Sequence, residues 1–140
     1  KDDDIVVLHM RDHGVDLYGN VIIANPDFLR FQPKAAQGFV RATIRGIQDT
    51  LRNPDAAIDS LMKRNPIAKR DVELERLKLS LQKNFVTADV QKNGLGAVDM
   101  KRLERSIEQI GLTFQYTNKP KAADIFTAQY LPAREQRLVK

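Results

Sequence analysis

Two runs of branched apolar residues near the N-terminus predict β-strands. Residues 5–8 read Ile-Val-Val-Leu and residues 21–24 read Val-Ile-Ile-Ala. A strand with one face in water alternates apolar with polar residues, whereas a strand in the middle of a sheet is apolar on both faces. We therefore predict interior strands over about residues 4–10 and 18–25. Gly14, which tolerates a positive φ, is expected to form the turn between them.

Two short strands cannot cover both faces and both edges of one another. The remaining strands of the sheet must then come from outside this chain. We expect them either from a missing upstream half of the protein or from a second copy in a dimer or swapped assembly. The chain is accordingly interpreted as the back portion of a larger α/β protein.

After the predicted strands, the apolar residues change to a spacing of three and four, which is typical of helices. The longest helix is expected from about Lys34 to Leu51. Helix starts are indicated by capping side chains at Asn25, Asn53, Thr87 and Asp99, and the two asparagines each precede a proline. Helical segments are expected at about 26–30, 34–51, 53–65, 71–84, 87–92, 99–111 and 122–126. The predicted fold class is α/β and helix-rich, with two strands followed by about five helices.

Two glycines lie inside the longest predicted helix, at positions 38 and 46. Each destabilises a helix by about 1 kcal/mol relative to alanine. We interpret them as places where another backbone packs close to the helix.

Composition excludes several classes of function. The 140 residues are 42% hydrophobic and 29% charged, and no apolar run approaches the roughly 20 residues of a membrane span. The absence of cysteine excludes disulfides, thiolate zinc sites and cysteine nucleophiles. The net charge of +5 arises from 23 basic and 18 acidic residues that are scattered together. We therefore expect no nucleic-acid partner.

Four possible metal ligands lie within eight residues of the N-terminal region: His9, Asp12, His13 and Asp16. Strand geometry directs His9 away from a turn residue such as His13, so a solvated turn is expected here instead of a metal site. None of the candidate serines has the Gly-x-Ser-x-Gly setting of a serine hydrolase. We predict no metal, no cofactor and no catalytic residue.

Arg41, Arg45 and Arg52 form a stripe on the longest predicted helix, opposite its apolar side. An arginine stripe can bind phosphates, but this one lacks interleaved aromatic residues and a recognisable nucleic-acid-binding motif. We interpret it as a solvated helix face.

Five side chains remain as candidate ligand contacts: Asp12, His13, Asp16, Tyr18 and Asn20. They would lie where a strand emerges from the sheet, which is where ligands collect in open α/β folds. Tyr18 offers a flat ring and a hydroxyl, and Asn20 offers both a donor and an acceptor. These groups suit a small polar or heteroaromatic ligand. The alternative is that Tyr18 belongs to the core and Asn20 to a turn.

Several segments resemble the C-terminal portion of ABC-importer substrate-binding proteins, in the NMT/THI-like group that is related to nitrate, sulfonate and taurine binders. The similarity covers essentially the whole chain. It is carried by Asp-Asp-Ile-Val-Val-Leu at 3–8, Arg-Asp-His-Gly-Val-Asp-Leu-Tyr-Gly-Asn at 11–20, Asn-Pro-Asp-Phe-Leu at 25–29, Phe-Val-Arg-Ala at 39–42, Asn-Pro-Asp-Ala-Ala-Ile at 53–58 and Asn-Gly-Leu-Gly-Ala-Val-Asp at 93–99.

The resemblance implies a bilobed type II periplasmic-binding-protein fold with a cleft between two α/β lobes. Residues 1–17 would end the second lobe and the hinge. Residues 18–140 would supply a crossing strand and the C-terminal part of the first lobe. Relatives often carry an aromatic residue before the turn glycine, where this chain has His13, which puts a stacking role at that position in doubt.

The resemblance also implies a function: a non-enzymatic solute-binding component that closes around a small molecule and delivers it to a membrane permease. It would reside in the periplasm or be lipid-anchored outside the cytoplasmic membrane. One alternative is an enzyme of thiamine-pyrimidine synthesis, whose cysteine-rich motif is absent here and would lie upstream. Another is a basic helical module that folds alone and binds an anionic partner.

Overall fold

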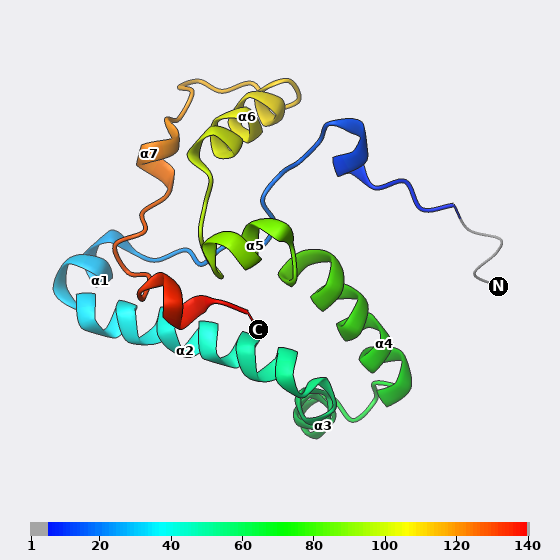
Figure 1. Ribbon diagram of the computed structural model, residues 1–140. Helices are drawn as coiled ribbons and strands as arrows, with labels where there is room; N and C mark the ends of the chain where they lie inside the picture. The colour runs from blue at the N-terminus through cyan, green and yellow to red at the C-terminus, as the bar shows by residue number, and fades with distance from the viewer. Residues whose placement is uncertain (1–5, 140) are drawn as a thin grey trace. The chain divides into compact units, whose positions relative to one another are not determined.

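The computed structural model describes residues 6–139, and the regular elements of this part of the chain are all helical (Figure 1). In chain order they are the 3₁₀-helix η2 (Met10–His13), α1 (Pro26–Phe31), α2 (Pro33–Arg52), α3 (Pro54–Arg64), α4 (Arg70–Ser80), the π-helical turn η3 (Leu81–Phe85), α5 (Ala88–Asn93), α6 (Met100–Gly111), α7 (Ala122–Ile125) and the 3₁₀-helix η4 (Arg134–Arg137). Between residues 6 and 139, no helix is both long and apolar enough to cross a bilayer.

The predicted α/β fold is wrong for residues 6–139, which contain no strand. Val21 and Ile23 of the predicted strand over 18–25 form no regular element and are 71% and 88% exposed. The predicted strand over 4–10 lies partly outside the described residues. Its last residue, Met10, is the first residue of η2. A helix satisfies its backbone hydrogen bonds within one segment, whereas a strand needs a second one. These two runs have the composition of interior strands, but residues 6–139 provide no segment that pairs with their described part.

The helix starts that the sequence predicts are confirmed by their caps. The side chains of Asn25 and Asn53 accept hydrogen bonds from the backbone N–H groups of Asp27 and Ala56, and each precedes a proline in the first turn. Thr87 caps α5 in the same way. Seven α-helices occur in residues 6–139, one at each of the seven predicted helical segments, although the predicted fold class gave about five.

The glycines of α2 have no close neighbour among the described residues. A Cβ added at Gly38 or Gly46 would meet nothing within 4 Å. The backbone that we expected to pack against these positions is therefore not found in the described part of the chain.

Contacts divide the chain into two compact units, each built from separated segments. Unit 1 comprises the described residues up to Ile23 together with Val98–Thr127. Unit 2 comprises Ala24–Ala97 together with the described residues from Ala128 onward. The predicted assignment of residues 1–17 and 18–140 to different lobes stays a prediction.

Unit 2 is organised along α2, which contacts α1, α3 and η4, while α3 packs against α4. Its core contains the buried apolar side chains of Ala36, Ile44, Ile58, Leu81 and Leu95. The Arg70 guanidinium, at the start of α4, lies 3.0 Å from carboxylate oxygens of both Asp55 and Asp59 on α3. Both contacts raise the pKa of Arg70. These charges join the two helices at their exposed side.

The C-terminal segment of unit 2 is tied to the loop after α5. The Arg137 guanidinium donates hydrogen bonds to the carbonyls of Asn93, Leu95 and Pro132, and the Leu95 N–H donates to the Arg137 carbonyl at 2.8 Å. Gly94 has a φ of +81° at this crossing, and a Cβ there would lie 3.0 Å from the Arg137 side chain. Only glycine meets both conditions without strain.

Candidate functional site

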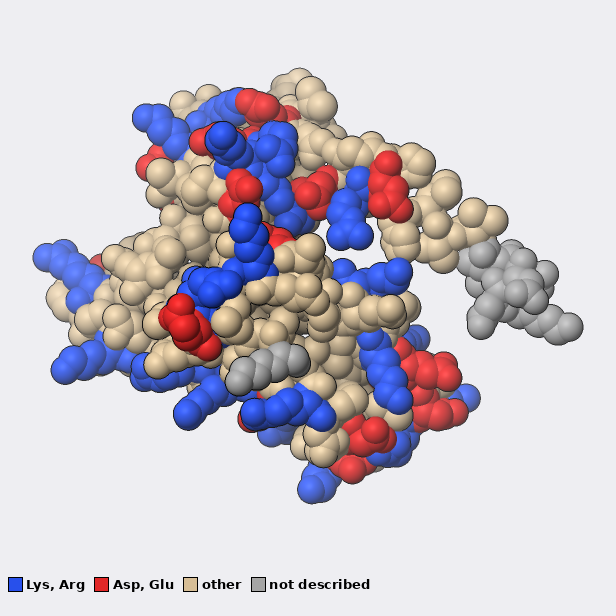
Figure 2. Space-filling model, viewed as in Figure 1, with Lys and Arg blue, Asp and Glu red and all other residues tan. Residues whose placement is uncertain are grey.

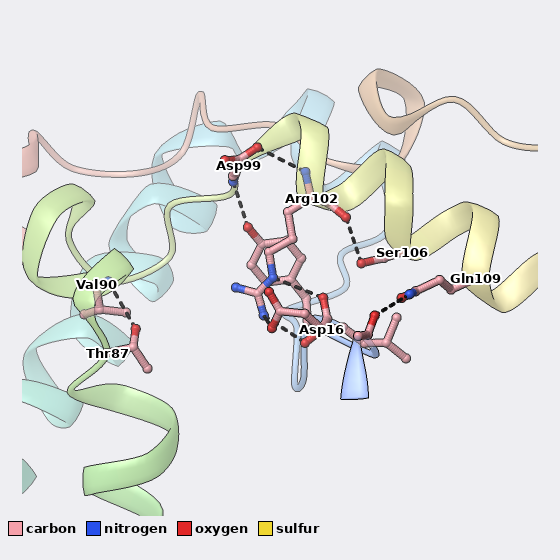
Figure 3. Close-up of polar contacts among 10 residues, drawn as sticks. Asp16, Thr87, Val90, Asp99, Arg102, Ser106 and Gln109 are labelled. Carbon is pink, nitrogen blue, oxygen red and sulfur yellow. Dashed lines mark hydrogen bonds and ion pairs between the residues drawn. The ribbon is translucent and has the colours of Figure 1, made fainter. Parts of the chain in front are cut away.

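Arg102 organises the part of unit 1 that contains the predicted ligand contacts (Figure 3). It is the third residue of α6, and its side chain reaches residues 16–18, which precede the second apolar run at 21–24. Its Nε donates to the Asp16 carbonyl at 3.2 Å, and its Nη2 donates to the Asp16 carboxylate at 2.8 Å and to the Leu17 carbonyl at 3.0 Å. The guanidinium also lies over the Tyr18 ring, 4.1 Å from its centroid. One side chain thus fixes three consecutive residues.

The Tyr18 hydroxyl and the start of α6 are joined by a further hydrogen bond. The backbone N–H of Asp99 donates to the Tyr18 hydroxyl at 2.8 Å. Asp99 is the N-cap of α6, and its carboxylate accepts from the Arg102 backbone N–H at 3.1 Å. This bond is the main cause that holds the pKa of Asp99 below its usual value. The tyrosine is therefore positioned by the first turn of the helix.

A second attachment lies further along the same helix. The Gln109 side chain donates to the Gly14 carbonyl at 2.6 Å. Gly14 has a φ of +85° and ends η2, so the chain turns sharply there. Residues 14–18 are consequently held at both ends by α6, and we call them the anchored segment.

The body of α6 is stabilised by its apolar side. Ile107 is 5% exposed, and α6 contacts α7, whose Ala122 is equally buried. The Tyr116 hydroxyl donates to the Ile107 carbonyl at 3.2 Å. These contacts give the anchored segment a packed helix as its support.

The structure brings together two of the five predicted contacts and leaves the other three on the surface. Asp16 and Tyr18 both bind α6 through Arg102 and Asp99. Asp12, His13 and Asn20 are exposed, and their side chains form no hydrogen bond with a described residue. Within residues 6–139, no three His, Asp or Glu side chains are grouped so that they could hold a metal ion.

Sequence reasoning did not identify Arg102 or Gln109. A signal for Arg102 was present, because a cation in the first turn of a helix opposes the helix dipole and is favourable only with an anionic partner. Asp16 supplies that partner. No comparable signal marks Gln109, whose neutral amide fits a solvated helix face equally well.

Comparisons with known proteins agree with the resemblance. Residues 1–57, which include all five predicted contacts, match the profile of the NMT1/THI5-like family. Over 131 residues the chain is 29% identical to the riboflavin-binding protein RibY of Chloroflexus aurantiacus, an alignment that covers 90% of this chain and 34% of that protein. The chain thus spans about a third of the length of this curated relative. No solved structure gives a significant match. The resemblance to NMT1/THI5-like binding proteins is confirmed.

Proposed function

We propose, from the resemblance to the NMT1/THI5-like family, that this chain is part of a solute-binding protein and contacts a small molecule through residues 12–20. The complete protein would deliver that molecule to the permease of an ABC importer, outside the cytoplasmic membrane. The family profile and the name of the relative both support binding over catalysis.

The observation that carries this proposal is the anchored segment. A site binds tightly when its contact groups are already held in the bound geometry, since less conformational freedom is lost on binding. Arg102 and Gln109 fix residues 14–18 from two points of one packed helix. The neighbouring side chains of Asp12, His13 and Asn20 are free of described partners. They are thus placed next to a fixed support with their polar groups available.

The groups that are already engaged retain some capacity for a ligand. The Tyr18 hydroxyl accepts a hydrogen bond from Asp99, so its own hydrogen is left to donate. Arg102 engages the Asp16 oxygen Oδ1, and the second carboxylate oxygen can accept further bonds. Asn20 adds one donor group and one acceptor. Such a mixture of donors and acceptors fits the edge of a planar heterocycle.

Riboflavin is the first ligand to test, because RibY is named as a riboflavin-binding protein and its alignment covers most of this chain. Remaining parts of the binding protein would complete the site. They would also cover Val21, Ile22 and Ile23, which are apolar and more than half exposed here.

Asn20→Ala gives the sharpest test, since the Asn20 side chain has no described partner whose loss would disturb folding. We expect it to weaken calorimetric riboflavin affinity of the complete binding protein by about tenfold, the effect of one or two lost hydrogen bonds. Tyr18→Ala is expected to weaken binding as well. Asn118→Ala, another exposed asparagine of unit 1, is the matched control and is expected to change nothing.

Equal affinity in the Asn20 and Asn118 variants would contradict the role of residues 12–20. Absence of riboflavin binding in the unsubstituted complete protein would contradict the ligand. Circular dichroism of each variant should retain the helical signal of the parent, which excludes unfolding as the cause of a lost affinity.

A further inference from the structure

Unit 2 carries an excess of positive charge that the proposed function does not use. Its two sequence segments, 24–97 and 128–140, contain 16 basic and 9 acidic residues, a net charge of +7. The other two segments contain 7 basic and 9 acidic residues, a net charge of −2. Figure 2 shows Lys and Arg side chains gathered along the α2 side of unit 2. The charge of the chain is thus concentrated on one of its units.

One face of α2 holds much of this charge. Residues on that face recur at spacings of three and four and include no acid: Lys34, Gln37, Arg41, Arg45, Gln48 and Arg52. Arg52 pairs with Asp49, which lies just off the face. Arg41 forms no hydrogen bond and no ion pair with any residue of the described part of the chain. Its guanidinium therefore has five donors that no group of residues 6–139 uses.

Arg41 borders a hollow between α2 and the C-terminal segment. The hollow has a volume of about 190 Å³ and is lined by Gln37, Arg41, Tyr130, Leu131, Pro132 and Gln136. Its far wall is held in place, because the Gln48 side chain donates to the carbonyls of Gln136 at 3.1 Å and Leu138 at 2.9 Å. Figure 1 shows this segment running beside α2. The hollow is therefore a formed feature of unit 2.

The lining has the chemistry of an anion site. It offers a guanidinium, two side-chain amides and a phenol as hydrogen-bond donors, and no carboxylate lines it. A guanidinium presents its N–H groups as a planar fork that matches the two oxygens of a carboxylate or phosphate. The volume is below the roughly 300 Å³ of typical pockets for larger ligands. A group of a few atoms fits this space best.

We propose that this hollow binds a small oxyanion, a phosphate or carboxylate group, with Arg41 as its main ligand. Gln37, Gln136 and the Tyr130 hydroxyl supply the remaining donors. Leu131 and Pro132 form the apolar part of the wall, while Gln37, Arg41 and Gln136 stay exposed to water. The site shares no residue with the anchored segment, so it is independent of the proposed solute site.

The test is a titration of the 140-residue chain with inorganic phosphate and, separately, with sodium acetate, each at constant ionic strength kept with sodium chloride. We expect saturable NMR shifts of the Arg41 side-chain N–H groups and of the backbone amides of Gln37, Leu131 and Gln136. Saturation by phosphate alone assigns the site to phosphate groups, and saturation by acetate alone assigns it to carboxylates. Saturation by neither overturns the proposal.

Arg52→Gln is the matched control, since it removes the same charge from the same face of α2 but lies outside the hollow. Arg41→Gln should weaken binding by about tenfold or more, as expected for lost hydrogen bonds to a charged group. Arg52→Gln should change affinity by less than about twofold, because distant exposed charges are screened by salt. Arg41→Lys keeps the charge without the fork and should bind less tightly than the parent. Equal losses in the Arg41→Gln and Arg52→Gln variants would show a general charge effect and overturn the site.

Discussion

Replacing Arg102 with methionine isolates the contribution of the contact that holds the anchored segment. Methionine keeps a long apolar side chain but removes the guanidinium and its three hydrogen bonds to Asp16 and Leu17. Arg105→Met is the matched control. Arg105 lies one turn later on α6, is exposed and forms no hydrogen bond with a described residue. Both substitutions remove one positive charge from the same helix.

The loss of stability expected in Arg102→Met follows from how exposed the contacts of Arg102 are. The side chains of Arg102 and Asp16 are 23% and 41% exposed, so we assign their ion pair about 0.5–1 kcal/mol. The contact with the Tyr18 ring adds about 0.5–1 kcal/mol. The two bonds to backbone carbonyls add about 1 kcal/mol together, because water replaces them when they are lost. Removing a cation from the first turn of α6 also relieves its unfavourable interaction with the helix dipole. This stabilises the folded state by about 0.3–1 kcal/mol. The expected net loss is about 1–2.7 kcal/mol.

Hydrogen exchange of the Asp99 amide measures this loss locally, since that N–H donates to the Tyr18 hydroxyl. A loss of this size accelerates exchange by roughly fivefold to a hundredfold when exchange proceeds through local opening. We expect this acceleration in Arg102→Met and little change in Arg105→Met. Equal exchange rates in the two variants, or no acceleration in Arg102→Met, would refute the role that we assign to Arg102.

Two further predictions concern single positions. The hydrogen bond from the Arg102 backbone N–H is the main cause that lowers the pKa of Asp99. The charged cap therefore stabilises the folded state at pH values above the ordinary carboxyl pKa. This stabilisation is lost as the pH falls through the lowered pKa. The helical circular dichroism of the parent should decline from about pH 4 downward more than that of Asp99→Asn, and identical acid profiles would contradict this. Gly46→Ala should stabilise the chain by about 0.5–1 kcal/mol in chemical denaturation, because a Cβ there meets open space. Destabilisation would instead support the original expectation that another backbone packs at Gly46.

The helices could be predicted from the sequence because their determinants are local. Asn53 caps α3 through an atom three residues away, and Pro54 sets the first helical φ. A strand depends on a partner segment that its own sequence does not specify. Val21–Ile23 therefore looked like an interior strand by composition, while the structure provides no such partner among residues 6–139.

The candidate site was predicted only in part for the same reason. The polar content of residues 12–20 led to the prediction of a ligand-contacting turn, which stays a prediction. Their attachment to α6 could not, because it joins residues that are far apart in the sequence. Arg102 donates to the carbonyls of Asp16 and Leu17. Because every residue has a backbone acceptor, the sequence does not indicate which residues Arg102 contacts.

The attachment of the anchored segment to α6 has a consequence for the order of folding during synthesis. Its hydrogen bonds join residues separated by 81 to 95 positions. At usual translation rates, a ribosome needs about 4–19 s to make the intervening chain. Helices α1 to α4 contact their sequence neighbours and can form within that time. The nascent anchored segment consequently lacks these contacts until α6 emerges.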